Sequence, residues 1–179
     1  MNKAMFRDKD KCINCYTCVV ACKAEHNYPP HVVFPPVPEP KGMTLIEVHQ
    51  HGPEIRDNKV YQYFLPLSCM HCADAPCVKA CPRSAIYKDI ESGYTFVDED
   101  KCIGCKFCLW VCPYGSPSFN EGGKMELCDM CIHRLREGKK TACEAACVAS
   151  AIFTGTTEEI ARLQGKKSIE RIDRGDITI

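Results

Sequence analysis

Sixteen cysteines in four groups constrain this chain more than any other feature of its sequence. In every group two residues separate the first two cysteines and three residues separate the last two. Two groups also share a longer phrase, "DKDKCINCYTC" from residue 8 and "DEDKCIGCKFC" from residue 98. The groups are Cys12, Cys15, Cys18 and Cys22; Cys69, Cys72, Cys77 and Cys81; Cys102, Cys105, Cys108 and Cys112; and Cys128, Cys131, Cys143 and Cys147.

The repeated spacing C-x-x-C-x-x-C-x-x-x-C is typical of loops that bind iron–sulfur clusters. Three thiolates two residues apart can hold three corners of a cubane, and the fourth can reach a second cluster. Such a loop must turn tightly, which predicts a left-handed backbone at Gly104 and at Asn14 in the first copy. Proline follows the fourth cysteine in two groups, at Pro82 and Pro113, as in bacterial ferredoxins.

At four thiolates per cubane, the sixteen cysteines predict four [4Fe–4S] clusters. Three other uses of cysteine are disfavoured. Disulfides would require export, and zinc prefers two C-x-x-C pairs with a longer spacer, a pattern that only the fourth group approaches. A c-type haem requires C-x-x-C-H, and no such pair here precedes a histidine.

The overall composition excludes several functional classes. The formal net charge is zero, so no bulk basic surface indicates nucleic acid. No apolar run is long enough for a membrane span, and "MNKAMFRDKDKC" carries no export signal. We therefore expect a cytoplasmic protein with reduced thiols, or a periplasmic one that is co-exported with a signal-bearing partner. No phosphate-binding loop or acid–base pair suggests a catalytic site of its own.

Short elements are expected between the cysteine groups. Six prolines between residues 29 and 40 predict an extended loop, with Val32, Val33, Phe34 and Val37 as apolar contacts for a partner or a cluster. Residues 44–67 predict a hairpin that turns around Gly-Pro and Asp-Asn, and residues 85–100 a second that turns near Ser92–Gly93. Residues 154–167 predict a helix with a Thr156–Glu159 capping box and a stop at Gly165. Bound metal must stabilise much of so small a core.

Side chains near the cysteines have simple expected roles. Apolar neighbours should pack around the clusters: Tyr16, Val19, Val20, Phe107, Leu109, Trp110 and Val111. Five lysines either raise cluster potentials or form a solvated face: Lys11, Lys23, Lys79, Lys101 and Lys106. His71 and His133 are expected to be hydrogen-bond donors near the clusters, and His49 and His51 to be exposed on a strand.

The four groups and their surroundings resemble the four-cluster iron–sulfur subunit of the dimethyl sulfoxide reductase family. The most specific stretches are "SCMHCADAPCVKACPRSAIYK" (68–88), "GYTFVDEDKCIGCKFCLWVCPYGSPSFNE" (93–121) and "KMELCDMCIHRLREGKKTACEAACVASAI" (124–152). The chain is also similar to the polyferredoxin small subunits of tungsten aldehyde oxidoreductases. Both resemblances imply a large catalytic partner with molybdenum or tungsten on a pterin, and the first adds the option of a membrane quinone subunit.

The resemblance also implies how the groups pair. Groups one and four would share two clusters, as would groups two and three, with each fourth cysteine exchanged between partners. The implied electron path runs through the clusters in single file away from the catalytic partner. Its order is Cys12, Cys15, Cys18, Cys147; then Cys22, Cys128, Cys131, Cys143; then Cys81, Cys102, Cys105, Cys108; then Cys69, Cys72, Cys77, Cys112.

The expected fold is α+β, with two nested ferredoxin-like dicluster units and short hairpins and helices around four cubane clusters. Residues 1–26 and 122–155 would form the first unit and residues 60–121 the second. Residues 27–59 would be an insertion and residues 156–179 a C-terminal helix and tail. The expected function is transfer of single electrons to or from the catalytic subunit. A free-standing polyferredoxin and a cluster-based sensor are the alternatives; zero net charge disfavours the first, and the lack of a DNA-binding element disfavours the second.

Overall fold

The computed structural model describes residues 3–28 and 43–173. The proline-rich segment 29–42, and with it the expected extended loop and its apolar contacts, lies outside the described residues. Helices and strands alternate irregularly, in agreement with the α+β class. In chain order they are β1 (Ala4–Arg7), α1 (Thr17–Glu25), β2 (Ile46–Arg56), β3 (Lys59–Ser68), α2 (Pro76–Ala80), β4 (Ile86–Lys88), β5 (Thr95–Val97), α3 (Phe107–Val111), β6 (Ser118–Phe119), β7 (Met125–Glu126), α4 (Ile132–Arg136), α5 (Ala142–Ala145), β8 (Ile152–Gly155) and α6 (Thr157–Asp173).

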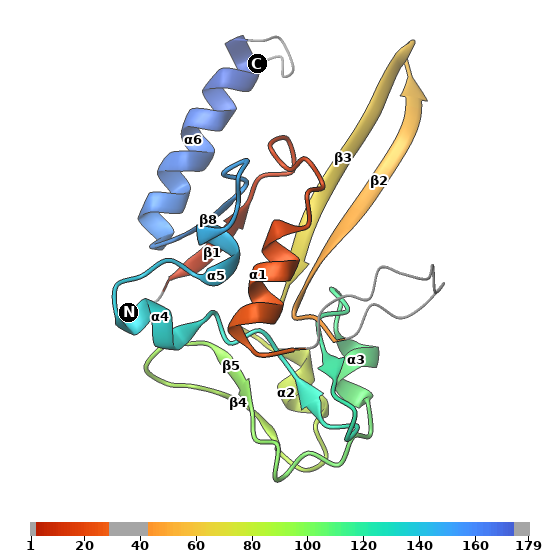
Figure 1. Cartoon of the computed structure of the whole chain (residues 1–179), viewed down its shortest axis with the longest axis vertical. Helices are drawn as coiled ribbons and strands as arrows, with labels where there is room; N and C mark the ends of the chain where they lie inside the picture. The colour runs from red at the N-terminus through yellow and green to blue at the C-terminus, as the bar shows by residue number, and fades with distance from the viewer. Residues whose placement is uncertain (1–2, 29–42, 174–179) are drawn as a thin grey trace.

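The strands form four separate two-stranded antiparallel sheets among the described residues. Three are local hairpins: β2 with β3, β4 with β5, and β6 with β7. The fourth joins β1 to β8, with Ala4 opposite Gly155 and Arg7 opposite Ile152. This pairing joins the N-terminal strand to a segment more than 140 residues later in the chain, and Figure 1 shows α1 beside α5 next to it. In the lower part of the same view α2 lies against α3, below the chain-end sheet.

Both predicted hairpins are present, with one correction. Ser92 and Gly93 lie between β4 and β5, and Gly93 has a φ of 71°. In the long hairpin the turn falls at Asp57 and Asn58, both with positive φ. The Gly52–Pro53 pair is not part of that turn, because it lies within β2 and shifts the register between His51 and Glu54. Proline lacks an N–H for the ladder, so a bulge accommodates it.

The C-terminal helix α6 confirms the predicted capping box. The backbone N–H of Thr156 donates to the Glu159 carboxylate at 2.8 Å, and the Glu159 N–H donates to the Thr156 hydroxyl at 3.3 Å. The predicted stop at Gly165 is wrong, since α6 continues to Asp173. A mid-helix glycine costs only about 1 kcal/mol, and Lys167 in the next turn binds Asp10 at 2.7 Å and Asp8 as well.

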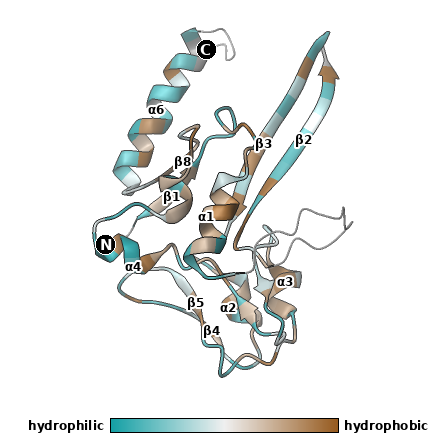
Figure 2. Ribbon diagram, viewed as in Figure 1, coloured by the Kyte–Doolittle hydropathy of each residue, from teal (hydrophilic) through white to brown (hydrophobic). Residues whose placement is uncertain are grey.

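Cysteine makes up much of the interior. The main core cluster has fifteen buried residues, and seven of them are cysteines. The apolar members, which include Val19, Ile46, Ile86, Met125 and Ile152, come from both the chain-end and the middle segments. Figure 2 shows that hydrophobic colour concentrates on α1 and the short helices, whereas most of α6 is hydrophilic. The hydrocarbon core is thus small, and the fold is arranged around its sulfur atoms.

Candidate iron–sulfur cluster sites

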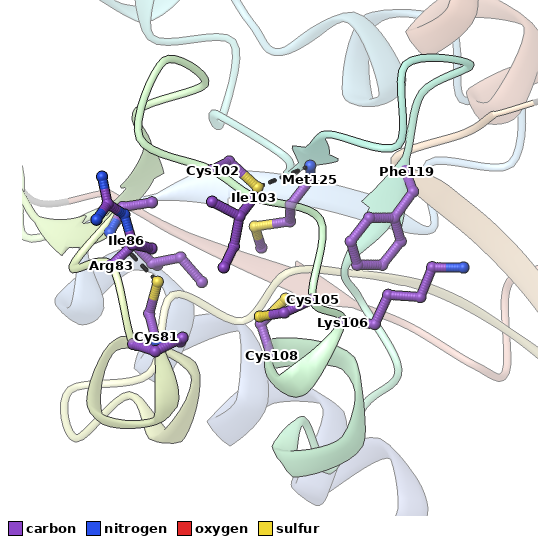
Figure 3. Close-up of a pocket in the computed structure, with 12 residues that line it drawn as sticks. Cys81, Arg83, Ile86, Cys102, Ile103, Cys105, Lys106, Cys108, Phe119 and Met125 are labelled. Carbon is purple, nitrogen blue, oxygen red and sulfur yellow. Dashed lines mark hydrogen bonds between the residues drawn. The ribbon is translucent and has the colours of Figure 1, made fainter.

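One cavity illustrates how cysteines from different groups meet. It lies between the loop after α2 and the loop before α3, and Figure 3 shows sulfur atoms directed into it from both sides. Three of its cysteines come from the third group, and Cys81 comes from the end of the second. Ile103, Phe119 and Met125 form its apolar wall. Its cysteines are Cys81, Cys102, Cys105 and Cys108.

Two further cavities repeat this composition. One is lined by Cys12, Cys15, Cys18 and Cys147, the other by Cys69, Cys72, Cys77 and Cys112. In each, three cysteines belong to one group and the fourth comes from the last position of another group. Thiolates in a tetrahedral set of four are the usual ligands of a cubane cluster. The residues of all three cavities therefore fit such a cluster.

The remaining four cysteines, Cys22, Cys128, Cys131 and Cys143, are all buried. The pKa of Cys22 is raised by burial and then by the neighbouring thiols of Cys128, Cys143 and Cys131. Group four is thus divided, since Cys147 lines the cavity of the first group. A zinc knuckle would need all four cysteines of group four in one place, so this separation disfavours zinc.

Helix geometry explains why consecutive cysteines serve different sites. The third and fourth cysteines of a group are four residues apart, so on a helix they share one face about 6 Å apart along the axis. Cys18 and Cys22 both lie in α1, which contacts α5. Likewise, α3 contains Cys108, ends just before Cys112 and contacts α2. Helix α1 can therefore present one sulfur to each of two neighbouring sites, whereas Cys112 follows α3 in an extended conformation.

The cysteine loops turn as the sequence predicts. Asn14 has a φ of 59° and Gly104 a φ of 69°, so both adopt the left-handed conformation. Tyr16 and Lys106, which precede α1 and α3, are also left-handed. A Cβ on Gly104 would lie 2.5 Å from the backbone oxygen of Gly123. Glycine is therefore needed at 104 for space as well as for conformation.

Backbone N–H groups donate hydrogen bonds to several of the sulfur atoms. Ala85 donates to Cys81 Sγ at 3.2 Å, and Ala151 donates to Cys147 Sγ at 3.1 Å. His71 donates its backbone N–H to Cys69 Sγ at 3.3 Å. Hydrogen bonds to the sulfurs of a cluster stabilise its reduced, more negative state and raise its potential. The first two bonds are equivalent in the two halves of the molecule.

Burial makes several of these thiols costly to ionise without a cation. It raises the pKa of Cys18 and Cys69 to about 12, and neighbouring thiols such as Cys143 and Cys128 contribute to these shifts. Burial likewise raises the pKa of Cys108 to about 11. Several negative thiolates in one buried site repel one another strongly. Iron would relieve this repulsion, so ligand binding and folding are coupled in this chain.

Two lysines that the sequence did not indicate hold cluster loops by their carbonyl groups. Lys88 in β4 donates to the carbonyl oxygens of His71 at 3.0 Å and Cys72 at 2.8 Å. Lys124, just before β7, donates to the carbonyl oxygen of Cys102. Both lie about twenty residues beyond the loops that they hold, so spacing within the loops gives no signal for them.

The expected packing of apolar side chains around the clusters holds only in part. Val19 is buried, at 2% exposure. Five others are exposed: Tyr16, Val20, Phe107, Val111 and Trp110, the last at 83%. Helical phase explains Val20 and Trp110, because each lies two positions after a buried cysteine and therefore on the opposite face of its helix. The prediction that these five side chains cover the clusters is wrong.

The charged neighbours also differ from one another. Lys79 pairs with Asp74 at 2.5 Å and Lys101 with Asp98 at 2.7 Å, and both lysines are largely exposed. These two fit a solvated face. Lys23 is buried, and burial lowers its pKa while Cys22 acts in the opposite direction.

The two histidines of the cluster loops differ. The ring Nδ1 of His71 accepts a hydrogen bond from the Thr95 N–H at 3.0 Å, its backbone N–H donates to Cys69 Sγ, and its buried Nε2 has no hydrogen-bond partner among the described residues. His133 binds Glu25 at 2.6 Å on the surface. His49 is exposed on β2, as predicted, and His51 is half-exposed.

The two cysteine sets that adjoin at the boundary between the units are not the two that the implied electron path places there. Burial is the main cause of the raised pKa of Cys69. The hydrogen bond from the His71 N–H lowers this pKa, and the charge of the nearby Cys128 raises it. Strand β1 contacts β3, which ends at Ser68, so the chain-end sheet lies directly against the start of group two. The set with Cys69 thus adjoins the set with Cys128, where the implied order had the set with Cys81.

Comparison with known proteins agrees with these sites. A family model described as "4Fe-4S dicluster domain" matches residues 60–157, and a second with the same description matches residues 11–86. An anaerobic dimethyl sulfoxide reductase chain from Escherichia coli (strain K12) is 39% identical over 161 residues, which cover 89% of the present sequence and 76% of that protein. The thiosulfate reductase electron transfer subunit PhsB of Salmonella typhi is 36% identical, covering 93% and 83%. A sulfite dehydrogenase subunit from Allochromatium vinosum is 35% identical, covering 87% and 69%.

Sites and matches together define a ferredoxin-type electron-transfer protein with two dicluster modules and four [4Fe–4S] clusters. The protein belongs to the iron–sulfur subunits of the dimethyl sulfoxide reductase family. Its function is to transfer electrons through these clusters. Among the described residues, no helix combines the length and the apolar character that a membrane crossing requires.

Proposed function

We propose that this protein carries single electrons between a large molybdenum- or tungsten-pterin catalytic subunit and a second redox partner. The observation that carries the proposal is the repeated cavity in which three cysteines of one group meet the last cysteine of another. Because the third and fourth cysteines of a group serve neighbouring sets, four clusters make a path through the molecule instead of a single redox centre. The second partner is a further redox subunit or a membrane quinone subunit.

The proposed ligand sets follow the cavities. They are Cys12, Cys15, Cys18 and Cys147; Cys22, Cys128, Cys131 and Cys143; Cys69, Cys72, Cys77 and Cys112; and Cys81, Cys102, Cys105 and Cys108. In this scheme residues 1–26 and 122–155 form a chain-end unit around a mid-chain unit of residues 60–121. The β1–β8 pairing and the contact of α1 with α5 support this nesting. Residues 27–59 are then an insertion, and residues 156–179 an addition to the chain-end unit.

The proposed electron path is reordered at the junction of the two units. The set with Cys12 comes first, next to the catalytic partner, and the set with Cys128 follows. The set with Cys69 is third and the set with Cys81 is last, because Cys69 rather than Cys81 has Cys128 among its charged neighbours. The cytoplasm is the proposed compartment, since cluster ligands must stay reduced.

The crossed ligand sets are tested by two cysteine variants on the same helix. Cys22→Ala should damage the cluster built on Cys128, Cys131 and Cys143, and should leave the Cys12 cluster with four thiolates. Cys18→Ala is the matched control, and it should damage the Cys12 cluster instead. Spectroscopy of each variant with iron counts per chain distinguishes them. The scheme fails if Cys22→Ala damages the Cys12 cluster and spares the other.

The partner is tested by affinity purification from the native host. A subunit much larger than this protein should co-purify, with molybdenum or tungsten in the complex. Purification of the protein alone with all its iron and no second protein would favour a free-standing polyferredoxin instead. Near-stoichiometric zinc without iron would contradict both.

A further inference from the structure

Arg7 and Val97 occupy equivalent positions in the two units, but one side chain is charged and the other is aliphatic. Arg7 ends β1 opposite Ile152, and Val97 ends β5 opposite Ile86. The next residue is an aspartate in both cases, and its N–H donates to an alanine carbonyl at nearly the same distance: 2.7 Å from Asp8 to Ala151 and 2.8 Å from Asp98 to Ala85. The same strand end thus bears a cation in the chain-end unit and a neutral aliphatic side chain in the mid-chain unit.

The Arg7 side chain spans the boundary between the units. Its Nη1 donates to Met70 Sδ at 3.1 Å, and its Nη2 donates to the Ser68 hydroxyl. These two residues flank Cys69, the first cysteine of the mid-chain unit. Arg7 and Cys69 also line the same cavity together with Met130 of the chain-end unit. The contacts therefore fix the guanidinium at the junction, beside the first cysteine of the mid-chain unit.

The charge of this guanidinium is only partly compensated by its hydrogen bonds. Its Nε is buried and has no hydrogen-bond acceptor within residues 3–28 and 43–173. Burial lowers the pKa of Arg7, and the nearby thiols of Cys128, Cys143 and Cys69 act in the opposite direction. Arginine nevertheless stays protonated in proteins, so a permanent positive charge lies among cysteines of two different sets.

We propose that Arg7 is an electrostatic bridge that raises the reduction potentials of the clusters held by Cys128 and by Cys69, and so sets the energy at which an electron crosses between the units. A nearby, partly buried cation stabilises an added electron and is screened by salt less than an exposed one. The crossing moves one electron from one cluster to the other and moves no atom, so Arg7 needs neither to gain nor to lose a proton. The bridge rests on the proposed ligand sets.

A purely structural anchor would give a different result from a bridge. An anchor acts through the bonds to Ser68 and Met70, and its loss would loosen the loop without selecting particular potentials. A bridge acts through charge, so a variant that keeps the charge should keep the potentials. The potentials of the individual clusters therefore distinguish the two roles.

The test uses the full chain purified anaerobically with its clusters, and potentials measured by redox titration with electron paramagnetic resonance. Arg7→Gln should lower the potentials of the Cys128 and Cys69 clusters by about tenfold in the reduction equilibrium, or about 59 mV for one electron. Arg7→Lys should retain most of the native values. Arg162→Gln, an exposed arginine of α6, is the matched control and should shift none of them.

Two outcomes would overturn the bridge: both potentials unchanged in Arg7→Gln, or equal shifts in all four clusters. If Arg7→Gln does not bind its full iron, Arg7→Val provides the same neutral test, because the equivalent position already holds Val97. The iron content of the unmodified protein checks the four clusters separately, and the Cys22→Ala variant checks the ligand sets. About sixteen iron per chain with no Arg7 effect would refute the bridge alone, and a lower count would refute four intact clusters.

Discussion

The first and third cysteine loops start from nearly the same phrase but lead into different helices. Asp8 and Asp98 both begin a turn in which the first cysteine donates its N–H to the aspartate carbonyl, at 3.2 Å and 3.1 Å. Helix α1 then runs through Cys22 to Glu25, whereas α3 ends at Val111. Pro113 explains the difference, because the residue before a proline avoids the helical conformation and Cys112 adopts an extended one.

The extra length of α1 has consequences for the chain-end unit. It places Glu25 against Arg134 at 2.8 Å, which connects the first helix to α4 within the fourth group. Helix α6 also packs on the chain-end unit, and its Lys167 binds the aspartates of the first loop. In the third loop, Asp98 pairs instead with the nearby and exposed Lys101. The same cysteine-loop structure thus has different contacts in the two units. The chain-end unit has more contacts between distant segments, because its parts lie far apart in the sequence and must be held together.

The largest effect should come from removal of iron, which tests whether either unit folds without its clusters. Seven of the fifteen buried residues in the main core are cysteines, so the apo chain loses the centre of both units. We expect chelation under anaerobic conditions to abolish the near-ultraviolet circular dichroism of the protein. A chelated sample that keeps a native-like spectrum would show that the hydrocarbon core suffices. Rebuilding the clusters should restore the signal and serves as the control.

The next largest effect is expected at the tight turns of the third and first loops, where Gly104 and Asn14 occupy equivalent positions. Gly104→Ala should cost at least about 1–2 kcal/mol for the left-handed backbone, and more because the new Cβ would collide with the Gly123 carbonyl. Asn14→Ala should cost less, since the first loop already accommodates a Cβ at this place. We expect Gly104→Ala to lose iron from the mid-chain unit and Asn14→Ala to retain it. Equal iron content in both variants would contradict the distinction.

These positions also show what can be predicted from the sequence. The left-handed turns, the hairpins and the capping box are local, so a few residues carry enough information. The exposure of Trp110 could not be inferred in the same way, because it depends on which face of α3 meets α2. The same holds for Arg7 and Lys88, whose partners lie 63 and 17 residues away. The position of the Cys69 set beside the Cys128 set depends on how β1 packs against β3, which neither cysteine group encodes.

A third effect tests the closure of the chain-end unit by α6. Lys167→Met removes the cation from Asp8, which is 6% exposed, and should destabilise the protein by about 1–3 kcal/mol. Lys101→Met removes the corresponding partner of Asp98, where both groups are more exposed and solvent screens the pair, and should leave the melting temperature nearly unchanged. Thermal unfolding of the cluster-loaded protein measures both. If the two variants are equally stable, α6 contributes no more to the first loop than a surface pair does to the third.

The pH dependence of the Lys167 pair has a defined sign. Burial lowers the Lys167 pKa, but hydrogen bonds to Asp10 and Asp8 outweigh it, and the net pKa is raised. A lysine with a raised pKa in the folded state contributes stability that is fully present below its unfolded value, about 10.4. That contribution is lost as the pH rises through the folded value. The stability difference between Lys167→Met and the unmodified protein should therefore be constant near neutral pH and shrink only in strongly alkaline solution.

The smallest effect concerns the start of α6, the helix that follows the chain-end sheet. Thr156→Ala removes the hydroxyl that accepts the Glu159 N–H, so one end of the reciprocal cap is lost, at a cost of about 1 kcal/mol. Ser168→Ala is the control, because its hydroxyl bonds the carbonyl of Gln164 within the same helix on an exposed face. Amide hydrogen exchange should increase in α6 of Thr156→Ala while the four cysteine loops keep their protection. Faster exchange at the first cysteine loop as well would mean that α6 and this loop open as one unit, which would make the helix part of the cluster site and no longer an attachment to it.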